Sequence, residues 1–281
     1  MGTVFITGAS RGIGAHVAAG LAADGHQVVA ASRSGNRPEG AAPELDIMSV
    51  VADVRDDESV RAAMATAVDR FGGIDVAIAN AGVGWFAPLE IMPGPSFDET
   101  IDTNLLGSIR LIRAAAPHLR ASGRGRVIAM SSLAAISGLP GETAYCASKA
   151  GLESALEALR YELLPFGVHV SIIQPGYTAG TGLVVSGRAP GMATDSVYEP
   201  LLVANDAGHE EVRQGAESPD LVLDAIREAI SSDKPAFRFP LGELGKDASQ
   251  MRHLADDEVL AIISELFGLD EWMAQGSGGQ S

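Results

Sequence analysis

The stretch Thr7-Gly8-Ala9-Ser10-Arg11-Gly12-Ile13-Gly14 joins an apolar run at residues 3–7 to a helix-forming segment at residues 12–24. Glycines allow a tight turn and a close approach of the backbone to a ligand, and the start of the following helix attracts an anion. A glycine-rich turn without a ligand is the alternative, since glycine spacing alone is a weak signal. Its position between a first strand and a first helix favours a bound nucleotide.

The rest of the chain alternates apolar runs with amphipathic segments. Strands are expected at 3–7, 27–31, near 50–52, and at 74–79, 126–130, 168–173 and 236–239; helices are expected at 12–24, 56–71, 97–119, 143–164, 218–230 and 256–266. Strands separated by helices of this length pair in parallel with right-handed crossovers. The expected fold is therefore a single-domain α/β protein with a doubly wound, parallel Rossmann-type sheet and helices on both faces.

The pattern changes beyond residue 174. Residues 181–215 are rich in glycine and proline, and a connection of this length in a compact domain usually has a function. We expect a dinucleotide-binding and catalytic domain at residues 1–255 with a variable substrate lid at about 181–215. A C-terminal helix and a flexible tail are expected at 256–281.

Composition excludes several classes of protein. The 281 residues carry a net charge of −16, which argues against a nucleic-acid binder. A single cysteine, Cys146, suits a reducing compartment, and the sequence shows neither a secretory leader pattern nor an apolar run of membrane-spanning length. The six histidines have no metal-ligand spacing. We expect a cytoplasmic protein without a metal, a membrane or a nucleic-acid partner.

The turn has the spacing T-G-x-x-x-G-I-G, and other motifs follow it in order. They are Asp53-Val54 after the third strand, Asn80-Ala81-Gly82 after the fourth, Asn104 in the next helix, Ser132 after the fifth strand, Tyr145-x-x-x-Lys149, and Pro175-Gly176 after the sixth. With these motifs the sequence resembles the short-chain dehydrogenase/reductase family, in its shorter-chain subclass. The resemblance covers residues 1–180 well and the remainder loosely.

The resemblance implies an oxidoreductase in which Tyr145 is the acid/base. Tyr145 and Lys149 are four residues apart, so they share one face of a helix. An ammonium about 4 Å away favours the phenolate by roughly 4 kcal/mol at an effective dielectric of about 20, which lowers the tyrosine pKa by about three units when desolvation is left out. A tyrosine tuned in this way can act near neutral pH.

Two further residues take roles from the family. The spacing of thirteen residues before Tyr145 favours Ser132 over Ser131 as the serine that binds the substrate oxygen. The family's asparagine corresponds to Asn104, which is expected to hold a water that relays protons to Lys149. The alternative is a buried asparagine that satisfies helix backbone.

The second strand indicates the cofactor. It ends at Ser32 and Arg33, without the carboxylate that binds the ribose hydroxyls in relatives that use NAD. Arg11 supplies a second guanidinium, which suits the 2′-phosphate of NADP(H). The expected cofactor contacts are Gly8, Ser10, Arg11, Gly12, Ile13, Gly14, Ser32, Arg33, Asp53, Val54, Asn80, Ala81, Gly82, Tyr145, Lys149, Pro175, Gly176 and Thr178. The family's usual threonine falls on Gly180 here, so either Thr178 or Thr181 contacts the nicotinamide amide.

The sequence thus predicts an NADPH-dependent reductase of a small, mostly uncharged ketone or aldehyde. Its expected substrate walls are Trp85, Phe86, Leu133, Ile136, Leu139, Leu183, Val184 and Val185, with Arg188 as the nearby base; Trp85 and Phe86 could equally be core. A non-catalytic NADP(H)-binding regulator or scaffold is the alternative. An extended-subclass epimerase would need a T-G-x-x-G-x-x-G turn and a larger C-terminal domain. Family members usually form homodimers or homotetramers, here through helices 97–119 and 143–164.

Overall fold

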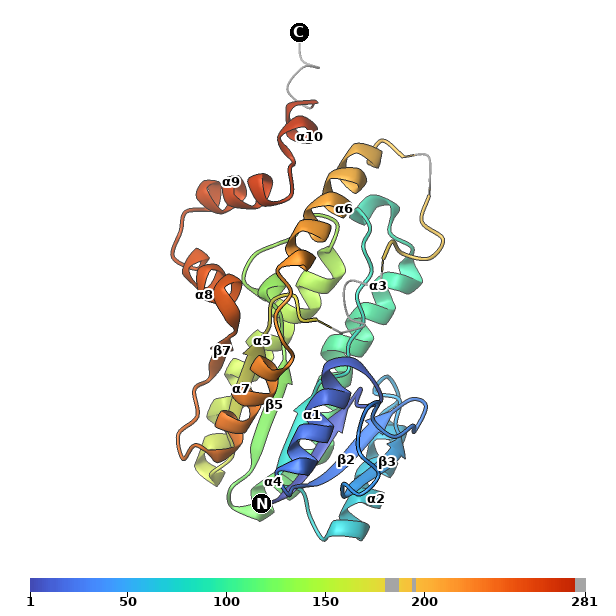
Figure 1. The fold of residues 1–281 in the computed structure, drawn as a ribbon, viewed down its shortest axis with the longest axis vertical. Helices are drawn as coiled ribbons and strands as arrows, with labels where there is room; N and C mark the ends of the chain where they lie inside the picture. Colours follow the sequence, from blue (N-terminus) through green and yellow to red (C-terminus); the bar gives the residue numbers. More distant parts are fainter. Residues whose placement is uncertain (180–186, 194–195, 276–281) are drawn as a thin grey trace.

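One parallel sheet forms the centre of the molecule (Figure 1). The computed structural model describes residues 1–179, 187–193 and 196–275. Within these residues the strand order is β3-β2-β1-β4-β5-β6-β7, and every neighbouring pair is parallel. The strands are β1 (Thr3–Thr7), β2 (Gln27–Ser32), β3 (Ile47–Val51), β4 (Val76–Ala79), β5 (Arg126–Met130), β6 (His169–Gln174) and β7 (Arg238–Pro240). The predicted doubly wound Rossmann-type fold is confirmed.

Helices cover both faces of this sheet. The helices of the described residues are α1 (Gly12–Ala23), α2 (Asp57–Phe71), α3 (Gly94–Ile101), α4 (Gly107–Ser122), α5 (Thr143–Leu163), α6 (Glu199–Gln214), α7 (Asp220–Ser231), α8 (Gly242–Met251), α9 (Asp256–Leu266) and α10 (Asp270–Gln275). Buried side chains of α1 and α7 pack on one face, and those of α2, α4 and α5 pack on the other. The strands are buried from both sides, which is why they are apolar runs rather than alternating patterns.

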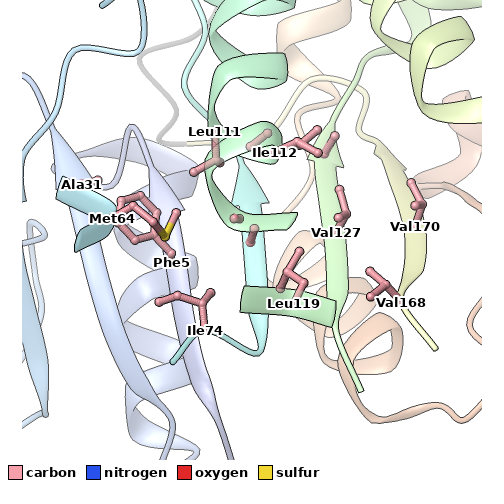
Figure 2. Packing of buried hydrophobic residues seen from close by; sticks show 14 of the residues in the cluster. Phe5, Ala31, Met64, Ile74, Leu111, Ile112, Leu119, Val127, Val168 and Val170 are labelled. Carbon is pink, nitrogen blue, oxygen red and sulfur yellow. The ribbon is translucent and has the colours of Figure 1, made fainter. Parts of the chain in front are cut away.

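The core between the sheet and α2, α4 and α5 is drawn in Figure 2. Phe5 from β1 and Val127 from β5 meet Met64, Leu111 and Leu119 from the helices, all nearly inaccessible to solvent. Burying a side chain of this size stabilises the fold by roughly 1.5–3 kcal/mol. The two faces together hold the strand ends rigidly where the chain turns toward a ligand.

Topology places a crevice at one end of the sheet. The chain proceeds outward from β1 through β2 to β3, then returns to pair β4 against the other side of β1. The connections after β1 and β4 therefore diverge at the carboxyl ends of adjacent strands. Ligands of doubly wound proteins bind at such a switch point.

The helix predicted at 97–119 is not uniform. It is formed by α3, a π-helical segment η2 (Asp102–Leu106) and α4, which follow one another without a break. A π turn inside a helix is rare and is found mostly at functional sites. Asn104 lies within this segment.

The C-terminal third contains more helix than the sequence analysis predicted. Helix α6 occupies much of the segment expected to be a lid, and α8 and α10 were not expected at all. The buried positions of α6, such as Leu201, Asn205, Gly208 and His209, have helical spacing, but polar and small residues among them hide the apolar stripe. Residues 180–186 and 194–195 of the lid and the predicted tail at 276–281 lie outside the described residues.

Two edges of the sheet differ slightly from expectation. Strand β3 begins three residues earlier than expected, at Ile47, and β7 extends to Pro240. Proline is tolerated in β7 because this strand is at the edge of the sheet. In the described part of the chain, no helix combines the length and apolarity needed to cross a membrane.

Candidate active site

A cavity of about 690 Å³ opens at the carboxyl ends of the strands. The turns after β1, β2, β4, β5 and β6 all contribute to its wall. The predicted site residues that line it are Gly8, Ser10, Arg11, Gly12, Ile13, Gly14, Ser32, Arg33, Asp53, Val54, Asn80, Ala81, Gly82, Ser132, Tyr145, Lys149, Pro175, Gly176 and Thr178. The structure thus brings together every predicted site residue except Asn104.

The glycine turn has the shape that a phosphate group requires. Gly8 and Gly12 have φ angles of 68° and 58°, a region that other residues rarely adopt. A Cβ on Gly14 would lie 2.3 Å from the carbonyl oxygen of Gly8, so no side chain can stand there. The turn therefore leaves open backbone beside the start of α1, and a dinucleotide pyrophosphate fits this place.

Hydrogen bonds tie the first turn to the fourth. The Thr7 hydroxyl accepts from the backbone N–H groups of Asn80 and Ala81 at 3.1 and 3.2 Å. The Asn80 side-chain amide donates to the carbonyl oxygen of Thr7 at 2.8 Å. These hydrogen bonds therefore fix the turn after β1 to the turn after β4, and they do so within the protein itself.

Three arginines lie at the end of the cavity beyond β2. Arg11 and Arg33 are exposed, and among the described residues no carboxylate lies within ion-pair distance of either. Arg55, which the sequence analysis did not single out, pairs with Asp53 at 2.7 Å and with Glu99 at 3.4 Å. Its hydrogen bond lowers the pKa of Asp53. The two unpaired guanidinium groups are the ones free to bind an anion.

Tyr145, Lys149 and Ser132 meet at the inner wall. The Lys149 ammonium lies 5.6 Å from the centre of the Tyr145 ring and donates to the carbonyl oxygen of Met130 at 2.7 Å. Both side chains are buried, with 7% and 3% exposure for Tyr145 and Lys149. The Ser132 hydroxyl lies near enough to the phenol oxygen to lower the pKa of Tyr145. These contacts place a proton donor and its neighbours at one point of the cavity.

Burial changes the expected electrostatics of the pair. It raises the pKa of Tyr145 above its ordinary value, and the hydrogen bond from Ser132 lowers it by less. Burial also lowers the pKa of Lys149 to about 8, against an opposing effect of Glu153. The expectation of a lowered Tyr145 pKa counted the ammonium alone; in the structure desolvation of the phenolate is the largest effect, and it raises the pKa.

The two adjacent serines have different partners. The Ser131 hydroxyl donates to Glu153 at 2.7 Å, in the interior. The Ser132 oxygen accepts from the backbone N–H of Ala134 at 3.2 Å and lies beside Tyr145. Successive side chains at the end of a strand point in opposite directions, which separates the two roles.

Asn104 lies behind the cavity wall rather than on it. It is fully buried, and its amide exchanges two hydrogen bonds of 2.8 Å with the backbone of Val83. It also donates to the Ser148 hydroxyl at 3.0 Å. The side chain therefore holds the loop after Gly82 against α5, and the water relay through Asn104 stays a prediction.

The substrate end of the cavity differs from the expected wall. Leu133 and Leu139 line it, but Ile136, Trp85 and Phe86 are not among the described lining residues. Trp85 donates to Glu99 at 3.2 Å, and Phe86 packs against Gly141. The other lining residues at this end are Ala134, Ser137, Glu142, Tyr177, Val212, Leu244, Asp247, Ala248, Met251, Ile263, Leu266 and Phe267. Helices α6, α8 and α9 supply many of them, and these contacts form only through the tertiary fold.

The remaining residues discussed in the sequence analysis differ in whether they reach the cavity. Arg188 pairs with Asp206 at 3.0 Å and Glu199 at 3.5 Å and does not line the cavity. Thr178 lines the cavity, whereas Thr181 and residues 183–185 lie outside the described residues. Burial raises the pKa of the Cys146 thiol to about 11, in keeping with a packing role.

A dinucleotide groove at the switch point of a doubly wound sheet, with a tyrosine and a lysine in its wall, is the arrangement of a nicotinamide-dependent oxidoreductase. A family model described as short chain dehydrogenase matches residues 2–190. Human 17-beta-hydroxysteroid dehydrogenase type 1 is 32% identical over 285 residues, which cover 94% of this chain and 86% of that protein. The chain belongs to the short-chain dehydrogenase family.

Solved structures agree with this assignment. A short-chain dehydrogenase from Streptomyces avermitilis is similar with a TM-score of 0.76 and 28% identity, over 100% of this chain and 99% of that one. An alcohol dehydrogenase from the archaeon Thermococcus sibiricus, complexed with 5-hydroxy-NADP, is similar with a TM-score of 0.70 and 27% identity, over 85% of this chain and 95% of that one.

Proposed function

We propose that this oxidoreductase is an NADP(H)-dependent ketone or aldehyde reductase that acts on a small, mostly uncharged substrate. The observation that carries the proposal is the meeting of Ser132, Tyr145 and Lys149 beside an open glycine turn in one cavity. A non-catalytic binding protein would have no chemical need for a buried tyrosine and lysine in contact with each other.

Ser132, Tyr145 and Lys149 each have a separate role at the carbonyl oxygen of the substrate. Ser132 and Tyr145 hold this oxygen by donating hydrogen bonds, which also stabilises the negative charge that develops on it. Tyr145 then gives its proton to the oxygen, and Lys149 stabilises the phenolate that remains. When bound, the nicotinamide supplies the hydride in the reductive direction. The elevated pKa of Tyr145 keeps the phenol protonated, as a proton donor must be.

NADP(H) is the proposed cofactor because two unpaired guanidinium groups, Arg11 and Arg33, stand beyond the end of β2. The nearest carboxylate in this wall, Asp53, is already paired with Arg55. The complex of the Thermococcus sibiricus relative with 5-hydroxy-NADP supports the same choice. A guanidinium binds a phosphate by charge-assisted hydrogen bonds that it cannot make to a bare ribose.

Replacing Arg33 tests the cofactor. Arg33→Asp is expected to weaken NADPH by about 10- to 150-fold, since a hydrogen bond to a charged group contributes about 1.5–3 kcal/mol. NADH affinity should stay within a few-fold of the wild type. Fluorescence titration of both cofactors measures this, with Arg188→Asp as a control because Arg188 does not line the cavity. Tighter binding of NADH than NADPH by the wild type would contradict the proposal.

The substrate class follows from the wall opposite the glycine turn. Leucine, alanine, methionine, isoleucine and phenylalanine side chains dominate it. A sugar phosphate would need several converging cations there, and Lys149, the one lysine in the described part of the lining, is buried against Tyr145. A panel of aromatic and alicyclic ketones, aldehydes and phosphorylated sugars, tested with both cofactors, identifies the class. Faster reduction of the phosphorylated sugars would contradict it.

We also infer a homodimer or homotetramer through α4 and α5. At the end of α5, Tyr161, Leu164 and Phe166 expose half or more of their surface, at 70%, 54% and 51%. Burying such side chains against another copy is favourable. Light scattering after gel filtration measures the mass, and a monomer at micromolar concentration would contradict the inference. A cytoplasmic location stays a prediction.

A further inference from the structure

A buried polar cluster lies on the substrate side of Tyr145. It consists of Glu142, His209 and Tyr177, which come from the start of α5, from α6 and from the turn after β6. Glu142 and Tyr177 line the cavity, and His209 lies directly behind them. The mechanism described above uses none of the three.

The contacts in this cluster are close. The Nε2 atom of His209 lies 3.1 Å from Oε1 of Glu142, and its Nδ1 atom meets the hydroxyl of Tyr177. Glu142 is 2% exposed and His209 is 6% exposed. The rings of Phe86 and Phe267 lie against the imidazole, with centroids 6.1 and 5.2 Å away. Aromatic rings therefore enclose the histidine, which holds its two nitrogens toward the tyrosine and the carboxylate.

The direction of the hydrogen bonds determines what the cavity presents to a substrate. An ionised carboxylate only accepts, so Nε2 of His209 must carry the proton that faces Glu142. This holds for the neutral and for the protonated imidazole. The approach is close but does not form a hydrogen bond, which leaves Nε2 of His209 without a hydrogen-bond partner. A buried carboxylate needs hydrogen-bond donors, and Glu142 lines the cavity from which a donor can reach it.

The position of Glu142 indicates where that donor must come from. Glu142 is the N-cap residue of α5, three residues before Tyr145, and both residues line the same cavity. The negative charge of Glu142 is near enough to raise the pKa of Tyr145. Glu142 does not cap the helix that it begins. Its carboxylate is instead directed to His209 at the cavity wall.

We propose that Glu142 is a specificity-determining residue that accepts a hydrogen bond from a hydroxyl group on the carbon next to the reacting carbonyl. His209 is the positioning residue that holds this carboxylate. The preferred substrate is then an α-hydroxy ketone or aldehyde with an apolar remainder. An α-keto carboxylate is disfavoured because its charge would lie against Glu142. This inference rests on the proposed reductase function.

Two ketones of similar shape test the donor requirement. α-Hydroxyacetophenone carries the hydroxyl, and α-methoxyacetophenone keeps the oxygen but lacks the donor. Calorimetry on the protein saturated with NADP+ measures their affinities without turnover, and kcat/KM is measured with NADPH. The wild type is expected to prefer the hydroxy ketone by about 10- to 150-fold, the range for a hydrogen bond to a charged group.

Three variants assign the preference to this cluster. Glu142→Gln is expected to lower it about 10-fold, because a neutral amide accepts more weakly. His209→Gln leaves the carboxylate in place but unheld, so KM for the hydroxy ketone should rise while kcat for the methoxy ketone stays near its wild-type value. Glu157→Gln is the control, because Glu157 is half exposed on α5 and does not line the cavity. It should leave the ratio of the two affinities unchanged.

The outcomes separate this inference from the proposed function. Equal affinity of the wild type for the two ketones, no measurable binding of either, or an unchanged ratio in both Glu142→Gln and His209→Gln would overturn the role of Glu142. Reduction of neither ketone nor any other carbonyl compound would instead contradict the proposed reductase. Circular dichroism of each variant shows whether the fold is kept, and His209→Gln decides the question if Glu142→Gln does not fold.

Discussion

Tyr145 has the protonation state of an acid rather than of a base. Its phenol is buried, and the charged form loses more solvation than the Ser132 hydrogen bond returns. The tyrosine therefore keeps its proton until an oxygen that can take it lies within reach. In the reductive direction this is the form the reaction uses.

Removing the phenol hydroxyl tests this role. Tyr145→Phe keeps the ring in the wall and is expected to lower kcat by at least 10²- to 10⁴-fold, about the range that general acid catalysis contributes. NADPH affinity should stay within a few-fold, because the variant retains the glycine turn and both arginines. Turnover near the wild-type value on any substrate of the wild type would show that another group supplies the proton.

Lys149 should leave a signature in the pH dependence of stability. Burial lowers its pKa to about 8 from the ordinary value of 10.5. Below pH 8 both the folded and the unfolded chain carry the proton, and the folded state bears the full cost of burying the charge. Between the two pKa values only the unfolded chain keeps the proton, so this group makes stability rise with pH.

The comparison with Lys149→Met isolates that contribution. One pKa unit corresponds to about 1.36 kcal/mol. The free energy of unfolding of the wild type, relative to that of the variant, should therefore increase by about 2 kcal/mol between about pH 8 and 9.5. Burial raises the pKa of Cys146, so its thiol destabilises the wild type and the variant alike at alkaline pH. Urea unfolding at several pH values measures the difference. A difference that stays flat would mean that Lys149 is neutral or well solvated.

Within a single element, helix α1 requires glycine at position 14 but can accommodate a larger residue at position 20. A Cβ at Gly14 would meet the backbone oxygen of Gly8 at 2.3 Å. A Cβ at Gly20 would meet a methyl group of Leu223 on α7, also at 2.3 Å. A backbone atom in a tight turn cannot move away, whereas a leucine side chain can change its rotamer.

Alanine should therefore be damaging at position 14 and tolerated at position 20. Gly14→Ala is expected to abolish cofactor binding and to lower the free energy of unfolding, since the turn must open. Gly20→Ala should change stability by no more than about 1 kcal/mol, because the gain in helix propensity offsets the repacking of Leu223. Thermal unfolding and NADPH titration of both variants measure this. Retained NADPH binding by Gly14→Ala would show that the turn has another way to adapt.

How far the sequence determines the site also differs between elements. The turns after the strands could be predicted because each motif is local and follows its strand directly. Helix α6 could not, because its inner face includes Asn205 and His209 where an apolar stripe would be expected. The pairing of Glu142 with His209 joins positions 67 residues apart, and no local pattern indicates it. The hydrogen bond of Asn104 in the π-helical segment with Val83 likewise joins positions 21 residues apart.

For the whole molecule, one carboxylate connects the sheet to the C-terminal helices. Glu153 on α5 is 3% exposed and accepts hydrogen bonds from four side chains. The donors are Ser131 at 2.7 Å, Gln174 at 2.7 Å, Arg238 at 3.2 Å and Arg252 at 3.0 Å. Ser131 directly follows β5, Gln174 ends β6, Arg238 begins β7, and Arg252 directly follows α8. The cavity wall formed by α8 is thus anchored one helical turn away from Lys149.

Loss of this carboxylate should unfold the protein more easily. Glu153→Ala is expected to lower the free energy of unfolding by about 1–3 kcal/mol, because the buried side chains of Ser131 and Gln174 lose their acceptor. Glu157→Ala is the matched control one turn along α5, since Glu157 is half exposed and, among the residues that the structure describes, pairs with Arg238 alone, at 3.3 Å. That change should cost about 1 kcal/mol or less. Equal effects of the two variants in urea unfolding would contradict the structural role of Glu153.

The wide helical turn at residues 102–106 makes the protein sensitive to deletions at one place in the chain. A π turn contains one residue more than an α turn, so the chain from α3 to α4 carries a surplus residue. Deleting one residue of this turn would let the helix close into a regular α-helix while α3 and α4 keep nearly the same rotational setting, because the wide turn absorbs the extra residue within itself. Ser96 and Thr100 would then stay buried, whereas Asn104, which lies inside the turn, would lose its position against Val83. A deletion within residues 102–106 should therefore disturb the loop that Asn104 holds more than the packing of α3.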